Sequence, residues 1–195
     1  DFSSKAFWDS RFQQEEHFEW LAAADVLTDK VASALQQQDP LKARILHIGS
    51  GTSTLSNSLR TRLVPSLISN PRNIVNLDYS ELAIERGRQL ELQEFGSIEM
   101  SYTVADLLNY SSLEASLHKI FDMPLLVNLV VEKSCADAIS CGPDITTQVT
   151  QPENIITVAP TVALALHLSR ITKSGSKWIA LSYSKYRFDF LNPDS

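Results

Sequence analysis

The chain has 195 residues, of which 44% are hydrophobic and 21% are charged, as is typical of one globular domain. Its net charge of −6 offers no basic surface for nucleic acid or for an anionic membrane. No apolar run reaches the roughly 20 residues of a membrane-spanning helix, and the opening residues lack a signal-peptide pattern. We therefore expect a cytoplasmic protein with no nucleic-acid or membrane partner.

Five short apolar runs alternate with segments typical of amphipathic helices. The expected strands are residues 43–48, 73–77, 100–105, 125–131 and 178–183. Helices are expected over residues 20–37, 55–63, from an N-cap at Ser80 to Gly96, from a capping box of Ser111 and Glu114, and from Pro160 to about Thr172. Gly175 is expected to end the last of these helices.

This alternation predicts an α/β fold with a Rossmann-like, doubly wound and mainly parallel sheet, covered by helices on both faces. Residues 1–195 form one domain in this interpretation. Residues 1–40 are an aromatic and helical cap, and residues 41–195 are the core. Ligands of such sheets bind where the strands end, at their carboxyl ends.

Two strand ends carry residues suited to a nucleoside. Gly49-Ser50-Gly51 follows the first strand and forms a sharp turn that lets a ligand approach the backbone. Asp78 ends the second strand and is placed to accept hydrogen bonds from ribose hydroxyls. A plain strand-to-helix turn and a helix cap are the alternatives for these two features.

The turn does not match a dinucleotide site. Thr54 stands where the dinucleotide fingerprint has its third glycine, and Asp78 follows Gly51 by 27 positions instead of about 20. S-adenosylmethionine (SAM) carries no phosphate and needs no such glycine. Asp106, after the third strand, is placed to accept the adenine amino group, with Leu107 as apolar cover. A surface carboxylate is the alternative for Asp106.

Ordered motifs along almost the whole chain resemble one branch of the class I methyltransferases. Trp8-Asp9-Ser10-Arg11-Phe12 resembles its Tyr-Trp-Asp-x-Arg-Tyr motif, and Glu19-Trp20 resembles the Asp-Trp pair that follows. Asn76-Leu77-Asp78-Tyr79-Ser80 is similar to Val-Asp-Tyr-Ser, and the segment from Val131 to Ala138 is similar to Glu-Lys-Gly-Thr-Leu-Asp-Ala. This branch includes the eukaryotic elongation factor 1A lysine methyltransferases and methyltransferase-like protein 13.

The resemblance implies SAM as cofactor, held by N-terminal aromatic residues and by residues at the strand ends. The expected contacts are Trp8, Arg11, Phe12, Trp20, Gly49, Ser50, Gly51, Asp78, Tyr79, Asp106, Leu107, Glu132 and Lys133. Aromatic rings can cover a sulfonium cation, and Arg11 can pair with the methionine carboxylate. Core packing is the alternative for the two tryptophans, and a surface charge is the alternative for Arg11.

The methyl acceptor is less clearly indicated. The resemblance implies a protein lysine amine, but Ser134 and Ala136 replace a Gly and a Leu of the family motif. A small-molecule acceptor is therefore one alternative, and a SAM-binding scaffold without catalysis is another. Glu132 and Asp137 are the candidate catalytic carboxylates, although Asp137 is equally suited to cap a helix. The scattered His and Cys residues predict no metal site.

The family fold has two further strands beside the fifth. Only about ten residues follow Tyr183, too few for two strands of ordinary length. We therefore expect a further segment or a partner chain to complete the sheet, because an open apolar edge invites aggregation.

Overall fold

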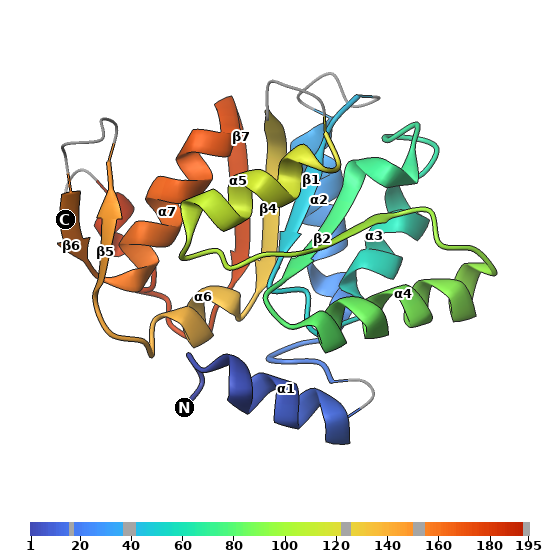
Figure 1. Ribbon diagram of the computed structural model, residues 1–195. Helices are drawn as coiled ribbons and strands as arrows, with labels where there is room; N and C mark the ends of the chain where they lie inside the picture. The colour runs from blue at the N-terminus through green and yellow to red at the C-terminus, as the bar shows by residue number, and fades with distance from the viewer. Residues whose placement is uncertain (16–17, 37–41, 122–125, 150–154, 193–195) are drawn as a thin grey trace.

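A computed structural model describes residues 1–15, 18–36, 42–121, 126–149 and 155–192. A five-stranded parallel sheet with the order β3-β2-β1-β4-β7 lies at its centre (Figure 1). The sheet strands are β1 (Ile45–Ile48), β2 (Ile74–Asp78), β3 (Ser101–Val104), β4 (Val127–Lys133) and β7 (Thr172–Leu181). The α-helices are α1 (Lys5–Gln14), α2 (Thr28–Leu35), α3 (Leu55–Leu63), α4 (Glu81–Phe95), α5 (Tyr110–His118), α6 (Cys135–Ile139) and α7 (Pro160–Ile171). Short 3-10 helices are η1 (Ala24–Leu27), η2 (Pro71–Asn73) and η3 (Asp189–Leu191).

The sheet is buried on both faces, which confirms the predicted doubly wound architecture. Alternate residues of a strand face opposite sides, so Ile45 packs in a cluster with Val31 of α2 and Leu59 of α3. Its neighbour Leu46 packs with Leu117 of α5 and with residues of α7. Burying each such side chain contributes about 1.5–3 kcal/mol. The continuous apolar runs in the sequence reflect this two-sided burial.

Several predicted helix ends are confirmed, and others differ. The Ser80 hydroxyl caps α4 by accepting from the Ala83 amide at 3.3 Å, and Gly96 ends the helix in the left-handed conformation. Pro160 opens α7. The expected capping box of Ser111 does not form. The helix begins earlier, at Tyr110, because the Asn109 side chain accepts from the Ser112 amide at 3.0 Å.

Two other expected boundaries also differ. The helix expected over residues 20–37 is shorter: η1 leads into α2, which ends at Leu35, and residue 37 lies outside the described residues. The last strand begins at Thr172, well before the expected residue 178, so Gly175 lies inside β7 with a φ of +82°. Glycine tolerates this positive φ, and α7 ends earlier, at Ile171.

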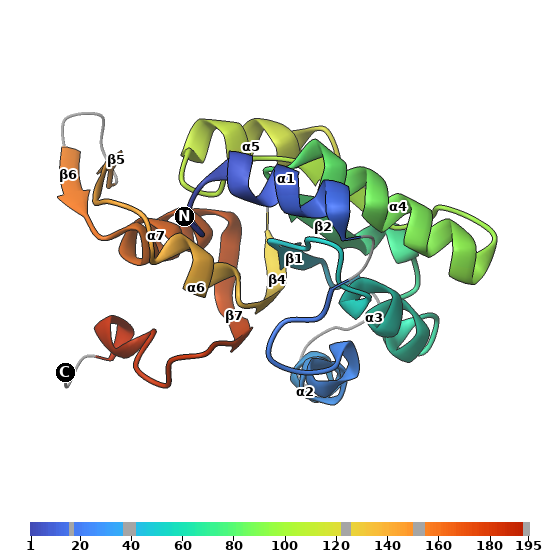
Figure 2. The ribbon, with the colours of Figure 1, turned by 90° about the horizontal axis from the view of Figure 1, so that it is seen from below.

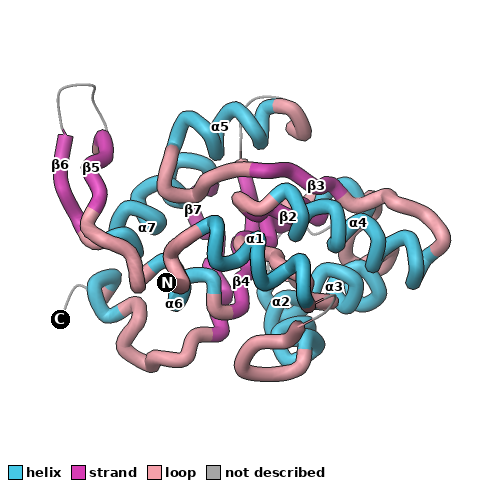
Figure 3. Tube along the Cα trace, turned by 60° about the horizontal axis from the view of Figure 1, so that its bottom comes forward, coloured by secondary structure: helices cyan, strands magenta, loops and turns pink. Residues whose placement is uncertain are grey.

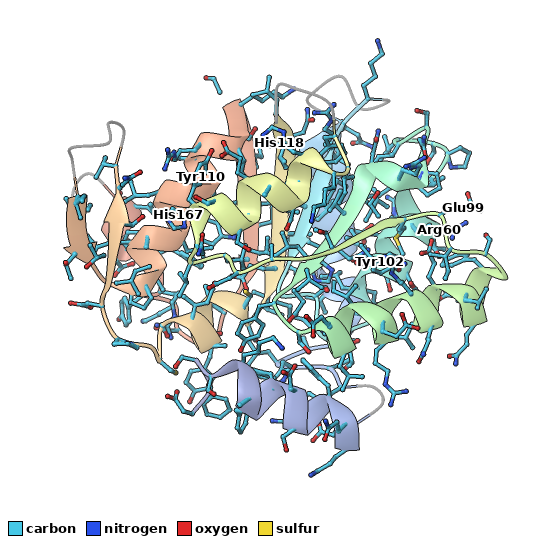
Figure 4. The ribbon with its side chains drawn as sticks, in the orientation of Figure 1. Arg60, Glu99, Tyr102, Tyr110, His118 and His167 are labelled. Carbon is cyan, nitrogen blue, oxygen red and sulfur yellow. The ribbon has the colours of Figure 1, made fainter. Side chains whose placement is uncertain are left out.

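A small antiparallel hairpin of β5 (Ile145–Gln148) and β6 (Ile155–Val158) was not expected from the sequence. It stands beside α7 at one side of the molecule (Figure 1). The buried His167 of α7 joins it to the core, since its ring nitrogens lie 2.7 Å from the Thr147 hydroxyl and 2.8 Å from the Leu107 carbonyl. The ring of Tyr110 lies beside His167, so α5 and α7 meet at this point (Figure 4).

The sheet order places a switch point between β1 and β4. The chain runs outward through β2 and β3 and then returns to β4 on the other side of β1. Helix α1 crosses the carboxyl ends of these strands (Figures 2 and 3). At the far edge, β7 pairs with β4 alone among the strands of the described residues. Completion of the sheet by another segment or chain remains a prediction.

Candidate functional site

The turn after β1 brings its backbone close to other parts of the site. Gly49 and Gly51 have φ values of +58° and +52°, in the left-handed region that favours glycine. A Cβ on Gly49 would lie 2.4 Å from the Cys135 sulfur, so only a glycine lets α6 approach this turn. The Gly51 amide donates to Asp78 at 2.9 Å, which joins the ends of β1 and β2.

Asp78 is buried at the end of β2, and both of its oxygens are engaged. Oδ2 accepts from the Gly51 amide, and Oδ1 accepts from the Ser80 amide at 2.9 Å. A carboxylate accepts up to about four hydrogen bonds, so capacity remains for ribose hydroxyls beside these backbone donors. Burial raises the pKa of Asp78 to about 6, against the effect of the backbone donors. Because its oxygens can accept further hydrogen bonds, Asp78 can bind the Gly51 and Ser80 amides and ribose hydroxyls at the same time.

The loop after β3 forms another part of the site. Asp106 is exposed, and its Oδ1 accepts from the Leu108 amide at 2.9 Å. Leu107 is buried, and its carbonyl is the group bound by His167. Tyr79 is half-buried nearby, and burial raises the pKa of its phenol above the usual range. These residues offer an apolar surface with one exposed carboxylate at its margin.

The N-terminal aromatic residues form one connected cluster over the site. The ring centroids of Trp8 and Phe12 lie 5.7 Å apart, and those of Trp8 and Trp20 lie 5.9 Å apart. The Arg11 guanidinium lies over the rings of Phe18 and Trp20, at 4.5 Å and 4.8 Å. Arg11 also pairs with Glu15 at 2.9 Å. Four of the predicted cofactor contacts therefore lie in one cluster over the strand ends. The cluster is formed by α1 and by residues 18–20, and we call this part of the chain the N-terminal cover.

Lys133 ends β4 and ties this cover to the sheet. It forms an ion pair with Glu19 and donates to the Ala22 carbonyl at 3.0 Å. Its side chain is only 3% exposed. Burial lowers the pKa of Lys133 to about 8. Glu19 was not singled out as a site residue from the sequence, because its partners are far away along the chain.

The two predicted catalytic carboxylates lie behind the site. Glu132 is fully buried, and its Oε2 accepts from the Cys135 and Ala136 amides at 2.7 Å and 3.3 Å. Asp137 accepts from the Ser182 hydroxyl, the Tyr183 amide and the Arg187 guanidinium, at 2.6 Å, 2.7 Å and 3.0 Å. Lys133 pairs with Glu19, and Asp137 pairs with Arg187. Glu132 thus caps α6, and Asp137 holds the segment after β7.

A buried polar chain under the turn was also missed from the sequence. His47 of β1 lies 2.7 Å from the Ser56 hydroxyl of α3, which in turn donates to Asn76 of β2. Burial lowers the pKa of His47 to about 4, so the ring is neutral at pH 7. In the sequence, His47 and Asn76 are only polar residues within apolar runs. Such a pattern is equally typical of an irregular strand.

Together these elements enclose a cavity of about 610 Å³. Its lining includes the predicted contacts Trp8, Arg11, Phe12, Trp20, Gly49, Ser50, Gly51, Asp78, Tyr79, Asp106, Leu107 and Lys133. Glu132 and Asp137 lie outside this lining. The volume lies within the range of small-ligand sites, about 300–1,000 Å³. In the described part of the chain, no three His, Cys, Asp or Glu side chains come together to hold a metal, and no helix could cross a membrane.

The site fits SAM on its own geometry. It combines a buried carboxylate with spare acceptor capacity, a close glycine turn and an aromatic cover at the switch point of a parallel sheet. The fold and the site thus define a Rossmann-like protein that uses a nucleoside cofactor. No family model matches the sequence.

The chain is 38% identical over 190 residues to "Methyltransferase srdJ" of Neurospora crassa, an alignment covering 97% of this chain and 70% of that protein. It belongs to the family of SAM-dependent methyltransferases, with SAM as cofactor. This relative does not favour the lysine methyltransferase branch that the motifs resemble.

Solved structures confirm the fold. One comes from work on the conversion of a disulfide bond into a thioacetal group during echinomycin biosynthesis. It has a TM-score of 0.55 at 17% identity, and the match covers 93% of this chain and 63% of that chain. The chain thus spans less than two thirds of the length of that structure.

Proposed function

We propose that this methyltransferase acts on a small-molecule acceptor and not on a protein lysine. The proposal rests on how Glu132 and Asp137 are bound. A lysine amine must lose its proton before it can attack a methyl group, and a nearby carboxylate would help. Oε2 of Glu132 and the Asp137 carboxylate instead accept from the protein's own amides, hydroxyl and guanidinium, and both residues lie outside the cavity lining.

The apolar part of the cavity lining supports the same proposal. It includes Phe2, Leu108, Ala138 and Ile139. An apolar wall of this kind packs against a small organic acceptor more readily than against a charged side chain. Ser134 and Ala136, which depart from the lysine methyltransferase motif, lie in the same part of the chain.

The protein residues contribute mainly by orientation and by exclusion of water. When bound, SAM supplies a methyl group on a sulfonium centre that an acceptor nucleophile displaces in line. Asp78 and the glycine turn would fix the nucleoside end, and the aromatic cover would shield the reacting centre. Holding the two reactants near attack distance lowers a barrier by at most about 7–11 kcal/mol.

The test is a methylation assay with radiolabelled SAM and a lysate separated into protein and small-molecule fractions. We expect label in the small-molecule fraction, and much less of it with the variant Asp78→Ala at the same SAM concentration. Label in protein bands would instead support a lysine acceptor. SAM binding measured by calorimetry, with no label transferred in either fraction, would support a scaffold without catalysis.

A further inference from the structure

The Glu19 carboxylate lies at the N-terminus of α3, although it belongs to the cover and not to the core. It accepts from the Thr54 amide at 2.8 Å and from the Thr54 hydroxyl at 3.1 Å. The Ser53 hydroxyl lies 3.0 Å from its other oxygen, which is also the one that pairs with Lys133. Three chain segments, the N-terminal cover, α3 and β4, therefore meet at one carboxylate.

This position has a specific electrostatic character. The first amides of a helix have no partner within the helix, and they carry a partial positive charge that attracts anions. In dinucleotide-binding domains, the pyrophosphate binds at this end of the helix that follows the first strand. Here the Thr54 side chain does not cap α3, and the Ser53 hydroxyl accepts from the Leu55 amide at 3.1 Å. The amide at the third fingerprint position, Thr54, donates to Glu19.

We propose that Glu19 is an internal anion that takes the place of a phosphate at the N-terminus of α3, and thereby holds the N-terminal cover closed over the SAM site. It is a positioning residue and a determinant of cofactor specificity. Phosphate-bearing nucleotides are excluded because the site for their phosphates is already filled by a carboxylate and by its Lys133 partner. The proposal depends on the SAM site alone and not on the identity of the acceptor.

The neighbouring contacts show how one carboxylate could order the cover. Phe18 and Trp20, on either side of Glu19, line the cavity and lie against Arg11. Lys133 binds Glu19 and also the Ala22 carbonyl, so the backbone is fixed on both sides of Trp20. A second anchor joins Asp9 of α1 to the Ser80 hydroxyl. Without Glu19, Trp20 would lose its nearest attachment to the sheet.

The first measurement uses inorganic pyrophosphate as a probe of the vacated position. The variant Glu19→Ala leaves Lys133 and the Thr54 amide without their carboxylate. We expect millimolar pyrophosphate to raise its Tm by about 2–4 °C, corresponding to roughly 1 kcal/mol for a chain of this size, and to leave the wild-type Tm unchanged. A purely structural role for Glu19 would lower the Tm without creating any response to pyrophosphate. Equal responses of the two proteins would overturn the proposal.

The second measurement follows the cover itself. We expect Glu19→Ala to bind SAM at least about tenfold more weakly by calorimetry, and to be cleaved faster within residues 1–20 by a protease. Asp25→Asn, which changes an exposed acid in η1, should match wild type in both assays. Unchanged SAM affinity in Glu19→Ala would contradict the proposal. If that variant does not fold, Glu19→Gln carries the SAM-binding and proteolysis tests, because it keeps an acceptor for Thr54 but loses the ion pair.

Discussion

At the scale of single residues, Asp78 shows how one side chain combines a structural and a ligand-binding role. Its two oxygens fix the Gly51 and Ser80 amides and still have room for further donors. We expect Asp78→Ala to weaken SAM binding by about 2–3 kcal/mol, roughly 30- to 150-fold, since two charge-assisted hydrogen bonds are lost. Calorimetry measures this loss, and thermal unfolding without SAM measures the separate cost of the lost caps. Unchanged affinity would mean that Asp78 only caps the turn.

Glu132 predicts a pH dependence of stability. Burial raises its pKa to about 7 from 4.5, and its Oε1 has no partner among the described residues. Between these two values the folded protein holds a proton that the unfolded chain has lost, so the contribution of Glu132 to stability falls as pH rises. The full change is about 3 kcal/mol.

The matched variant for this prediction is Glu132→Gln, which cannot ionise. From pH 4.5 to 7.5, its free energy of unfolding should increase by about 3 kcal/mol relative to wild type. Urea denaturation at three pH values measures this difference. A difference that stays constant over the range would show that Glu132 is ionised throughout in the folded protein.

Gly49 and Gly96 allow backbone strain to be separated from a steric clash. Both have positive φ values, but a Cβ at Gly96 meets nothing within 4 Å, whereas one at Gly49 meets the Cys135 sulfur at 2.4 Å. We expect Gly96→Ala to cost about 1–2 kcal/mol of stability, from conformation alone. Gly49→Ala should cost more and should also weaken SAM binding, because α6 and the turn must separate. Chemical denaturation of both variants decides this, and equal costs would be inconsistent with the close approach.

At the scale of elements, a buried ion pair joins α3 to α4. Arg60 lies 2.6 Å from Glu91, whose side chain is fully buried and also accepts the Glu99 and Met100 amides before β3. Arg60 and Glu99 lie together at this edge of the molecule (Figure 4). Removing Arg60 leaves a buried carboxylate without its cation, which typically costs about 3–5 kcal/mol.

We therefore expect Arg60→Ala to lower the free energy of unfolding by about 3–5 kcal/mol. Arg62→Ala is the matched control, because Arg62 lies on the same helix but pairs with an Asp29 side chain that is 85% exposed. Exposed pairs contribute roughly 0–1 kcal/mol. The two variants should thus differ several-fold in urea denaturation. Similar losses would mean that the burial of Glu91 does not increase the contribution of the Arg60 pair to stability.

The elements also show what the sequence allowed us to predict. Strands and helix ends followed from local patterns, since Ser80, Gly96 and the apolar run of β4 act through neighbours in the chain. Helix α1 was not delimited, because its aromatic residues pack against one another and against the distant sheet ends and give no single apolar face. The hairpin of β5 and β6 was missed, because its four-residue strands alternate too briefly to be distinguished from a loop.

The same distinction holds for the site residues: those with a local signal in the sequence were predicted, and those with distant partners were not. Gly49, Gly51 and Asp78 were predicted because each carries a local signal at a strand end, and the structure brings them together. Glu19 carries no such signal, since its partners Thr54 and Lys133 are 35 and 114 positions away. The roles of Glu132 and Asp137 depend on contacts made only after the strands assemble. Long-range polar contacts of this kind are set by the fold and are not visible in local patterns.

At the scale of the whole molecule, the N-terminal cover and the core are separable. The buried residues of the two core clusters all lie between Ala24 and Ile171, whereas residues 1–20 contribute the aromatic wall of the cavity. Deleting residues 1–20 should therefore abolish SAM binding, because the rings and Glu19 are lost, while the parallel sheet stays folded. Calorimetry with SAM and a cooperative unfolding transition followed by circular dichroism measure the two effects. The double variant Trp8→Ala and Trp20→Ala, which keeps the chain length, should reproduce most of the loss of affinity. A truncated protein that binds SAM like the full chain would mean that the aromatic residues only pack against one another, and the cover would then have no part in holding the cofactor.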